Sequence, residues 1–360
     1  MFDPVRDLIA RAVESRVCPA ACVETGSRVG AVWRASAGAL TYEPGAARAD
    51  DGTVFDLASL TKVIATTSLT MRLVGTARLD LSAPVREWIP EWRGDDRAGV
   101  TVRDLLEHCS GLPAWAPLHQ TCADRTEVLR AIAGWPLAYR PRRASVYSDL
   151  GFMLLGFVLE AAGGATLPDQ WRAAVARGAA GTPDADLTFG ARPEWLPRVA
   201  PARADSRRGY LLRGDVDDDN AWTFGGGAGH AGLFGTVTAV GAFARTVLGA
   251  RAGVTSAETA LASRDTVRVF LSPSAVPASS RACGWDLMRP TSSCGSRMSP
   301  AAFGHTGFTG TSLWIDPERD LYVVLLTNRV HPTAGSSDPI QALRRAVHDA
   351  VLDETPPTDY

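Results

Sequence analysis

A serine and the only lysine of the chain stand three residues apart, in Ser59-Leu60-Thr61-Lys62. Among 37 Lys and Arg residues, every positive side chain except Lys62 is an arginine, which stays protonated in proteins. A lysine at this one place suits a task that needs the loss of a proton. Residues three apart share a helix face, so the spacing predicts contact between Ser59 and Lys62. It is typical of a serine nucleophile that works without a histidine.

Apolar residues around this pair predict the helix that must position it. Asp56 or Ser59 could cap its start, and Gly75 is expected to stop it. The helix is apolar nearly all round, which predicts a buried helix. Burial should then lower the pKa of Lys62, and the positive end of the helix dipole should lie near the Ser59 hydroxyl. The apolar positions are Leu60, Val63, Ile64, Leu69, Met71, Leu73 and Val74.

Two later stretches also carry residues suited to catalysis. Tyr147-Ser148-Asp149 precedes an apolar run over 150–160, which predicts a helix. A neighbouring ammonium favours the phenolate of a tyrosine, so Tyr147 can act as a general base or share a proton with Lys62. His305-Thr306-Gly307 precedes a predicted strand over 309–315, which should pair antiparallel with a strand over 321–327.

The three stretches, in this order, resemble the signatures of the serine β-lactamases and penicillin-binding proteins, and above all those of class C β-lactamases, D,D-peptidases and related esterases. The resemblance extends from about residue 20 to the C-terminus. It implies an α/β (α+β) fold in which an antiparallel β-sheet is flanked by helices and carries an inserted, mostly helical lobe. Residues 1–85 and 215–360 would form the sheet lobe and 86–214 the helical lobe, with the active site between them.

The resemblance also implies roles for individual residues. Ser59 would attack an ester or amide carbonyl, and Lys62 and Tyr147 would manage its proton. The backbone N–H groups of Ser59 and Phe308 would form an oxyanion hole. No metal or cofactor is implied. The residues expected to bind substrate or stabilise the oxyanion are Asp149, His305, Thr306, Gly307 and Phe308.

Two of these positions depart from the pattern of the family. Asp149 stands where the family has Asn, and a carboxylate cannot donate the hydrogen bond of an amide to a ligand carbonyl. It could pair with Lys62 instead. His305 stands where the family has Lys in its usual form, and an imidazole is mostly neutral at pH 7. Both departures favour an esterase or amidase over a true β-lactamase.

Other interpretations remain open or fail on particular residues. A true β-lactamase or a D,D-peptidase is the alternative within the family. A non-catalytic binding protein on this fold would be expected to lose Ser59, Lys62 or Tyr147, and all three are present. The Gly227–Gly232 stretch has the glycine spacing of a dinucleotide site, but lacks a preceding strand and an acidic residue about 20 positions on. His230 in this stretch is expected to be a packing or rim residue.

Composition is that of a globular protein with no polyanion preference. The chain has 360 residues, 46% of them hydrophobic and 21% charged, with a net charge of −2, so no nucleic-acid partner is expected. It shows no signal-peptide pattern at its start and no apolar run of membrane-spanning length, and we expect a cytoplasmic protein with no membrane partner. The expected partner is a small ester, amide or β-lactam substrate.

Two possible metal sites fail on spacing. Residues 215–226 lack the glycine and glutamate of a calcium-binding loop. The spacing of the second group matches no common zinc pattern, and the six cysteines are expected to be reduced packing residues. That second group is His108, Cys109, His119 and Cys122.

The remaining patterns predict the elements around the site. Helical spacing predicts a first helix near 5–13 and a last helix over 340–351 that covers one face of the sheet. Strands over 20–25 and 28–35 should form a hairpin that turns at Gly26-Ser27. Helices are expected to begin near Thr101, near Asp124 and at Val237.

Overall fold

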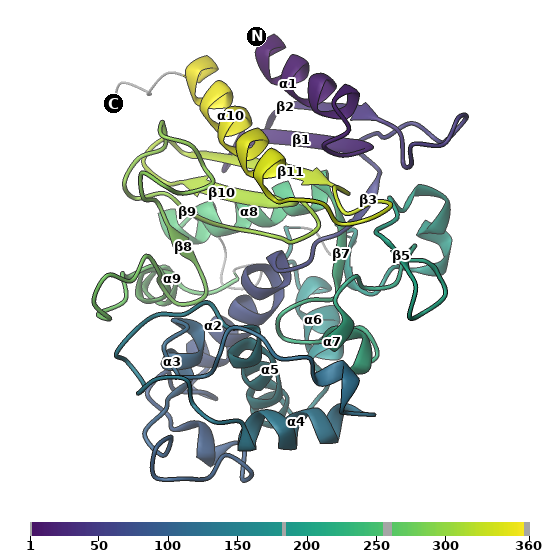
Figure 1. Ribbon diagram of the computed structural model, residues 1–360. Helices are drawn as coiled ribbons and strands as arrows, with labels where there is room; N and C mark the ends of the chain where they lie inside the picture. Colours follow the sequence, from purple (N-terminus) through teal and green to yellow (C-terminus); the bar gives the residue numbers. More distant parts are fainter. Residues whose placement is uncertain (1, 182–184, 255–260, 356–360) are drawn as a thin grey trace.

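The computed structural model describes residues 2–181, 185–254 and 261–355. The larger of its sheets is antiparallel, has six strands and occupies the upper half of the view in Figure 1. The strand order is β2-β1-β11-β10-β9-β8. The strands are β1 (Ala20–Ser27), β2 (Gly30–Gly38), β8 (Asp286–Leu287), β9 (Phe303–Thr306), β10 (Ser312–Asp316) and β11 (Leu321–Thr327).

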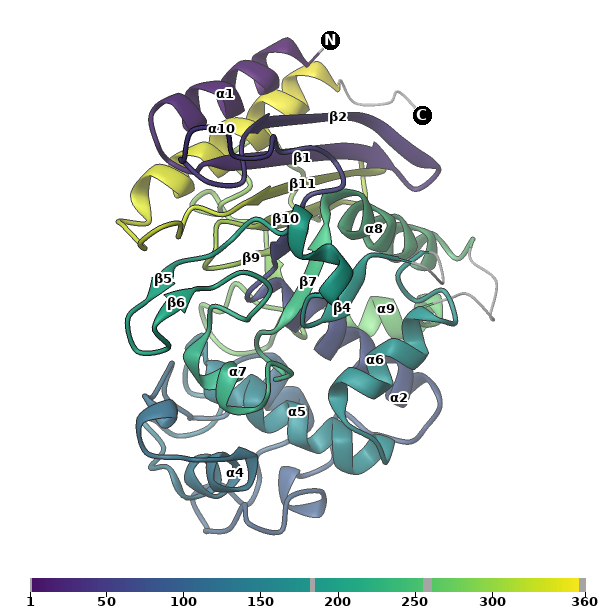
Figure 2. The same ribbon diagram turned by 90° about the vertical axis from the view of Figure 1, so that its right-hand side faces the viewer.

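Helices cover both faces of this sheet (Figure 2). Helices α1 (Asp3–Glu14) and α10 (Asp338–Glu354) lie side by side on one face, and α8 (Val237–Ala252) crosses the other. Successive side chains of a strand point to opposite faces. Val323 therefore packs in the cluster of α1 and α10, whereas its neighbour Val324 packs in the cluster of α8.

A second sheet of three strands connects the large sheet to the helices below it. Its order is β3-β7-β4, with bounds β3 (Val54–Asp56), β4 (Leu187–Phe189) and β7 (Leu233–Thr236). A small hairpin pairs β5 (Ala204–Asp205) with β6 (Tyr210–Leu211). Strand β3 leads directly into the turn that carries Ser59, the predicted nucleophile, so this sheet fixes where that turn begins.

The lower part of the molecule is helical, and α5 runs through its centre (Figure 1). Eleven of the fifteen residues of α5 are buried, so the helix is a core element. Helix α5 spans Asp149–Gly163 and contacts α2 (Ser68–Gly75), α3 (Val102–Leu106), α4 (Arg125–Gly134) and α6 (Leu167–Val175). Two further helices are α7 (Asp219–Thr223) and α9 (Arg264–Phe270), and α9 contacts α2 and α8. Short helical turns are η1 (Lys62–Thr67), η2 (Val85–Glu87), η3 (Leu118–Gln120) and η4 (Pro193–Arg198).

The structure confirms the predicted fold class and most of the predicted elements. The β1–β2 hairpin is present, but it turns at residues 28–29 because the strands continue through Gly26 and Ser27. Strand β10 begins at Ser312 and not at Thr309, since residues 307–311 form a turn. The helix after Ser59 ends at Gly75 as predicted.

The division into two lobes stays a prediction. Strand β4 lies within the predicted helical lobe, yet it pairs with β7 of the predicted sheet lobe, so the second sheet joins the two parts.

Within the described residues, no single helix is long and apolar enough to cross a membrane. Helices α5 and α6 meet the length and composition criteria only together, as a pair bent by 69°.

Candidate active site

The nucleophile turn connects β3 to a π-helical turn, η1, that runs on into α2. Ala58, just before Ser59, has a φ of 47°, a left-handed conformation that costs an L-residue roughly 1–2 kcal/mol. Its N–H donates to Asp56 Oδ1 at 2.8 Å. The predicted helix cap by Asp56 or Ser59 is wrong, because η1 has Thr61 at its N-cap position and no side-chain cap. Asp56 holds the turn before the helix instead.

Ser59 Oγ lies at hydrogen-bond distance from two proton-carrying groups. Lys62 Nζ donates to it at 2.9 Å and the Tyr147 hydroxyl donates to it at 2.8 Å. The predicted contact between Ser59 and Lys62 is therefore confirmed. Tyr147 lies in the turn before α5, far from Ser59 in the sequence, and the fold brings its hydroxyl to Ser59 Oγ.

Oxygens surround the fully buried Lys62 ammonium. It donates to the backbone carbonyl of His230 at 3.1 Å, and Asp149 Oδ1 lies 2.7 Å away. The predicted pairing of Asp149 with Lys62 is confirmed as an ion pair, although the two groups are not aligned as a hydrogen bond. Asp149 thus places a negative charge beside the nucleophile where an amide was expected from the family.

The prediction that Lys62 has a lowered pKa is wrong. Burial does act to lower the pKa of Lys62, but the Asp149 carboxylate and the Tyr147 hydroxyl outweigh it and raise that pKa above its usual value. Burial also raises the pKa of Tyr147, against the opposing effect of Lys62. In the resting site both groups therefore hold their protons at neutral pH.

Helix α5 fixes Tyr147 and Asp149 at its N-terminus. Ser148 between them caps the helix by accepting the Gly151 N–H at 3.0 Å. The Ser148 N–H donates to Nδ1 of buried His108 at 2.9 Å, and the His108 ring lies 4.8 Å from the Tyr147 ring. Sequence analysis weighed His108 only as a metal ligand, and no local pattern showed that it supports Tyr147.

Strand β9 forms the opposite edge of the site. His305 is buried, and its ring centroid is 5.7 Å from that of Tyr147. Burial, followed by the charges of Lys62 and Arg281, holds the pKa of His305 well below 6.5. His305 is therefore neutral at pH 7, as expected for a position that has lost the charge of a lysine.

Gly307 brings the end of this strand against the nucleophile turn. A Cβ at this position would lie 2.6 Å from the Leu57 carbonyl oxygen and 3.2 Å from the Ala58 Cβ. Ser59 and Phe308 both line the same cavity, and neither backbone N–H donates to a protein acceptor among the described residues. These are the two groups predicted as an oxyanion hole.

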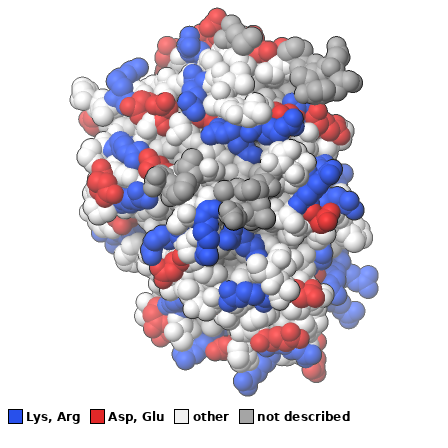
Figure 3. Space-filling model, turned by 180° about the vertical axis from the view of Figure 1, so that it is seen from behind, with Lys and Arg blue, Asp and Glu red and all other residues white. Residues whose placement is uncertain are grey.

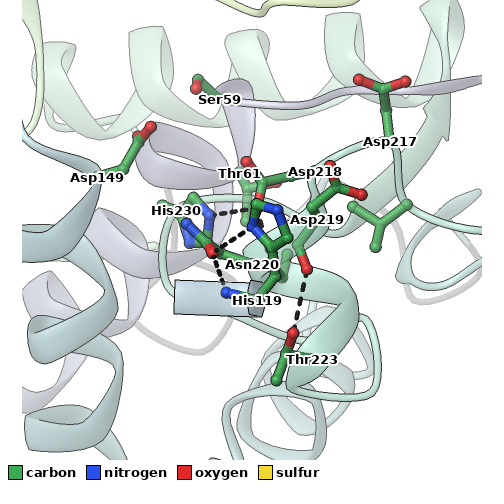
Figure 4. A network of polar contacts seen from close by, with 12 residues as sticks. Ser59, Thr61, His119, Asp149, Asp217, Asp218, Asp219, Asn220, Thr223 and His230 are labelled. Carbon is green, nitrogen blue, oxygen red and sulfur yellow. Dashed lines mark hydrogen bonds and ion pairs between the residues drawn. The ribbon is translucent and has the colours of Figure 1, made fainter. Parts of the chain in front are cut away.

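The cavity at Ser59 has a volume of about 590 Å³ and contains both acidic and basic side chains. Figure 4 shows Asp217 and Asp218 at the end of the loop that leads into α7, and Asp219 is the first residue of that helix; all three line the cavity together with Ser59 and Asp149. His230 contacts Asp218 at 2.9 Å, so it is part of this polar network and not only a packing residue. Residues that line the cavity are Ala58, Ser59, Trp115, Tyr147, Asp149, Arg203, Asp217, Asp218, Asp219, His230, Ala231, Arg281, Asp286, His305, Thr306, Gly307, Phe308, Arg329, Ser337, Ile340 and Arg344.

No pattern in the sequence predicted that Arg203, Asp217 or Arg344 line the cavity. The acidic stretch at residues 215–219 was considered only as a calcium loop, but in the structure Arg203 lies within 3.5 Å of both Asp217 and Asp219. Arg344 of α10 donates to the Gly307 and Thr311 carbonyls at 2.7 and 2.9 Å. One sequence feature could have located part of the cavity wall. The density of aspartates at residues 215–219 could have marked the stretch as more than a solvated loop.

The chain matches known proteins over most of its length. The family model described as Beta-lactamase matches residues 5–347. A curated relative from Escherichia coli (strain K12), named "Putative D-alanyl-D-alanine carboxypeptidase", is 30% identical over 315 residues, and the match covers 79% of this chain and 71% of the relative.

Solved structures show the same fold at low sequence identity. EstCE1, described as a hydrolase with promiscuous acyltransferase activity, superposes with a TM-score of 0.74 at 20% identity, covering 96% of this chain and 97% of its own. A class C β-lactamase from Rhodobacter sphaeroides gives 0.74 at 18% identity, covering 98% of this chain and 100% of its own. The matched range and the identity to the curated relative together show that the chain belongs to the Beta-lactamase family of serine hydrolases.

Proposed function

We propose that this protein is an esterase or amidase that works through an acyl-enzyme on Ser59. The observation that carries the proposal is that Ser59 Oγ lies within 2.9 Å of both Lys62 Nζ and the Tyr147 hydroxyl, in the wall of a cavity. No other group is needed to account for proton movement at this oxygen. Lys62, Tyr147 and Ser59 are thus the proposed catalytic residues.

The reaction would proceed in two steps. Once the Tyr147–Lys62 pair has lost a proton to solvent, Ser59 Oγ attacks the substrate carbonyl carbon and its own proton passes to that pair. The carbonyl oxygen becomes an oxyanion held by the Ser59 and Phe308 N–H groups. The pair then returns a proton to the leaving oxygen or nitrogen as its bond to carbon breaks. In the second step a water molecule loses a proton to the same pair and attacks the acyl carbon. The bond from that carbon to Ser59 Oγ then breaks, the proton returns to Oγ, and the carboxylic acid is released.

Two features of the cavity favour a simple ester or amide over a β-lactam. His305 is neutral, and Asp149 cannot donate a hydrogen bond while it is ionised, so two contacts expected for β-lactams in the family are lost. Trp115 and Phe308 line the cavity with about half of each side chain exposed, which offers apolar surface to an acyl group.

A D,D-carboxypeptidase is the second candidate, and Arg344 and Arg329 favour it. Both line the cavity next to β9, and their hydrogen bonds go to backbone carbonyls and to no carboxylate among the described residues. Burial and the charge of Arg329 lower the pKa of Arg344 to about 10, so an anion beside it would be stabilising. The name of the Escherichia coli relative suggests the same activity.

Labelling of the nucleophile tests the proposed function. A fluorophosphonate should add one adduct to the wild type at Ser59 and none to Ser59→Ala. Short-chain p-nitrophenyl esters should then be hydrolysed much faster than nitrocefin or an acylated D-alanyl-D-alanine peptide. No adduct would contradict the assignment of the nucleophile, and faster release of D-alanine would favour the second candidate.

Restoring the residues of the family tests why β-lactams are disfavoured. The double variant His305→Lys with Asp149→Asn should raise nitrocefin turnover relative to ester turnover. An unchanged ratio would show that these two positions do not set the selectivity.

A further inference from the structure

Asp56 is a buried carboxylate that the proposed reaction does not use. It is the last residue of β3, its side chain is 4% exposed, and its two oxygens accept from two different loops. Oδ1 accepts the Ala58 N–H at 2.8 Å, and Oδ2 accepts the Asp217 N–H at 2.7 Å. In its ionised form this carboxyl group fixes backbone N–H groups more strongly than a neutral acceptor would.

The main chain of the same residue holds a third loop. The Thr309 hydroxyl donates to the Asp56 carbonyl at 2.7 Å, and the Thr311 hydroxyl donates to the next carbonyl, that of Leu57, at 3.0 Å. Thr309 directly follows Phe308. Asp56 therefore contacts the chain one residue before Ser59 and one residue after Phe308.

The conformation of Ala58 indicates that the hydrogen bond from its N–H to Asp56 also restrains the backbone of the turn. With φ at 47°, Ala58 holds a backbone conformation that alanine rarely adopts, and such a residue persists only where its surroundings fix it. The bond from the Ala58 N–H to Asp56 Oδ1 supplies that restraint directly. Without it, the turn would relax and carry the Ser59 N–H with it.

We propose that Asp56 is a positioning residue that sets the separation between the Ser59 and Phe308 N–H groups and so forms the oxyanion hole. The inference rests on the proposed function for its effect on rate, and on geometry alone for its effect on the two turns. An oxyanion hole stabilises a transition state only when its donors are already in place, so loosening one end should lower kcat and leave KM nearly unchanged.

Three variants test this role. Asp56→Ala removes both side-chain acceptors, and Thr309→Val removes the hydroxyl at the other end while keeping the shape of the side chain. Thr246→Val in α8 is the matched control, because it also loses a buried threonine hydrogen bond, to the Ala242 carbonyl at 3.1 Å, but lies on a helix that does not line the cavity.

Rates should be measured per active site, counted by complete fluorophosphonate labelling, so that unfolded protein does not enter. We expect Asp56→Ala to lower kcat about 10²-fold, near the effect of removing one oxyanion-hole donor. Thr309→Val should lower it about tenfold, KM should change less than threefold in both, and Thr246→Val should keep the wild-type kcat. Equal kcat in wild type and Asp56→Ala, or a loss confined to KM, would overturn the inference.

Hydrogen–deuterium exchange gives a readout that does not depend on activity. In Asp56→Ala, peptides that contain residues 57–60 and 307–310 should exchange faster than in the wild type, while peptides from α8 should be unchanged. Unchanged exchange in both turns would overturn the inference even if the proposed function holds. Faster exchange in a protein whose wild type takes no fluorophosphonate would leave the positioning role standing and remove the proposed function.

Discussion

At the scale of single residues, Asp149 controls the protonation of Lys62 and Tyr147, the two groups that contact Ser59 Oγ. Its carboxylate lies 2.7 Å from Lys62 Nζ, and it raises the pKa of Lys62 and that of Tyr147. An ammonium and a neutral phenol both donate to Ser59 Oγ, and neither can accept its proton. The pair must lose a proton before Ser59 can attack, so the rate should rise with pH.

Asp149→Asn should move this rise to lower pH. Removal of the carboxylate removes an effect that raises both pKa values, and a neighbouring carboxylate typically shifts a pKa by about 1–3 units. We expect the acid limb of the profile of kcat/KM against pH, measured with a p-nitrophenyl ester, to move down by roughly one unit or more.

The control for this prediction is Asp186→Asn, which also breaks an ion pair, with Arg198, but does not line the cavity. Its profile should match the wild type. A limb that stays in place or moves to higher pH in Asp149→Asn would show that Asp149 does not control the proton at Ser59.

At the scale of elements, the turn between β9 and β10 connects the sheet to Ser59, the proposed nucleophile. The sequence predicted a continuous strand from residue 309, but Gly310 has a φ of 106° and its N–H bonds back to the Gly307 carbonyl. Arg344 reaches from α10 to two carbonyls of this turn. The terminal helix, predicted only as a cover for the sheet, therefore also shapes the substrate side of the site.

Gly307→Ala should disrupt this turn. The added Cβ would lie 2.1 Å from Thr311 Oγ1 and 2.6 Å from the Leu57 carbonyl oxygen, so backbone must move. We expect a loss of about 10² or more in kcat and about 1–3 kcal/mol in the free energy of unfolding, measured by steady-state kinetics and urea unfolding.

Gly134→Ala is the matched control, because nothing lies within 4 Å of a Cβ at this last position of α4. It should keep wild-type kcat and gain up to about 1 kcal/mol of stability. A Gly307→Ala enzyme with full activity would contradict the close packing of this turn on Ser59.

At the scale of the whole molecule, two buried carboxyl groups differ from the charged groups on the surface. Acidic and basic side chains are intermixed over the face seen in Figure 3, in agreement with the net charge of −2. Beneath the surface, burial raises the pKa of Asp56 to about 7 and that of Asp217 to about 6. Asp217 Oδ1 has no hydrogen-bond partner among the described residues.

Asp217→Asn should therefore change how stability depends on pH. In the wild type the folded state keeps a proton on Asp217 that the unfolded state, with a pKa near 3.9, has lost, so this contribution to stability disappears as pH rises through about 6. The asparagine has no such loss. We expect the variant to gain free energy of unfolding relative to the wild type between pH 4.5 and 8, as measured by urea unfolding.

Asp205→Asn serves as the comparison. Burial acts to raise the pKa of Asp205, but the N–H groups of Arg208 and Arg207 and nearby arginines lower it below 3.8, so it stays ionised across this range. The difference in free energy of unfolding between Asp205→Asn and the wild type should not change with pH. If the free energy of unfolding of Asp217→Asn instead fell relative to the wild type as the pH rises, the result would contradict a buried, poorly solvated carboxyl group at this position.

Local patterns predicted what depends on neighbours in sequence. The contact of Ser59 with Lys62 follows from helical spacing, and the family motifs located Tyr147 and His305. The direction of the Lys62 pKa could not be predicted in this way, because it depends on how close Asp149 comes through the packing of α5 against η1. The supports from His108 and Arg344 are long-range for the same reason: no local spacing relates them to the residues they hold.

The pairing of β1 with β11 has a consequence for synthesis of the chain on the ribosome. Ala21 lies opposite Thr327, and the β1–β2 hairpin leaves the exit tunnel about 300 residues before its partner strand does. During that interval β1 offers an unpaired, apolar edge, which is the kind of edge that attracts other chains. The turn that contains Ser59 is translated early as well, yet the turn that faces it, from Gly307 to Thr311, follows about 250 residues later. The nascent chain thus carries Ser59 in an incomplete setting until this second turn has been made.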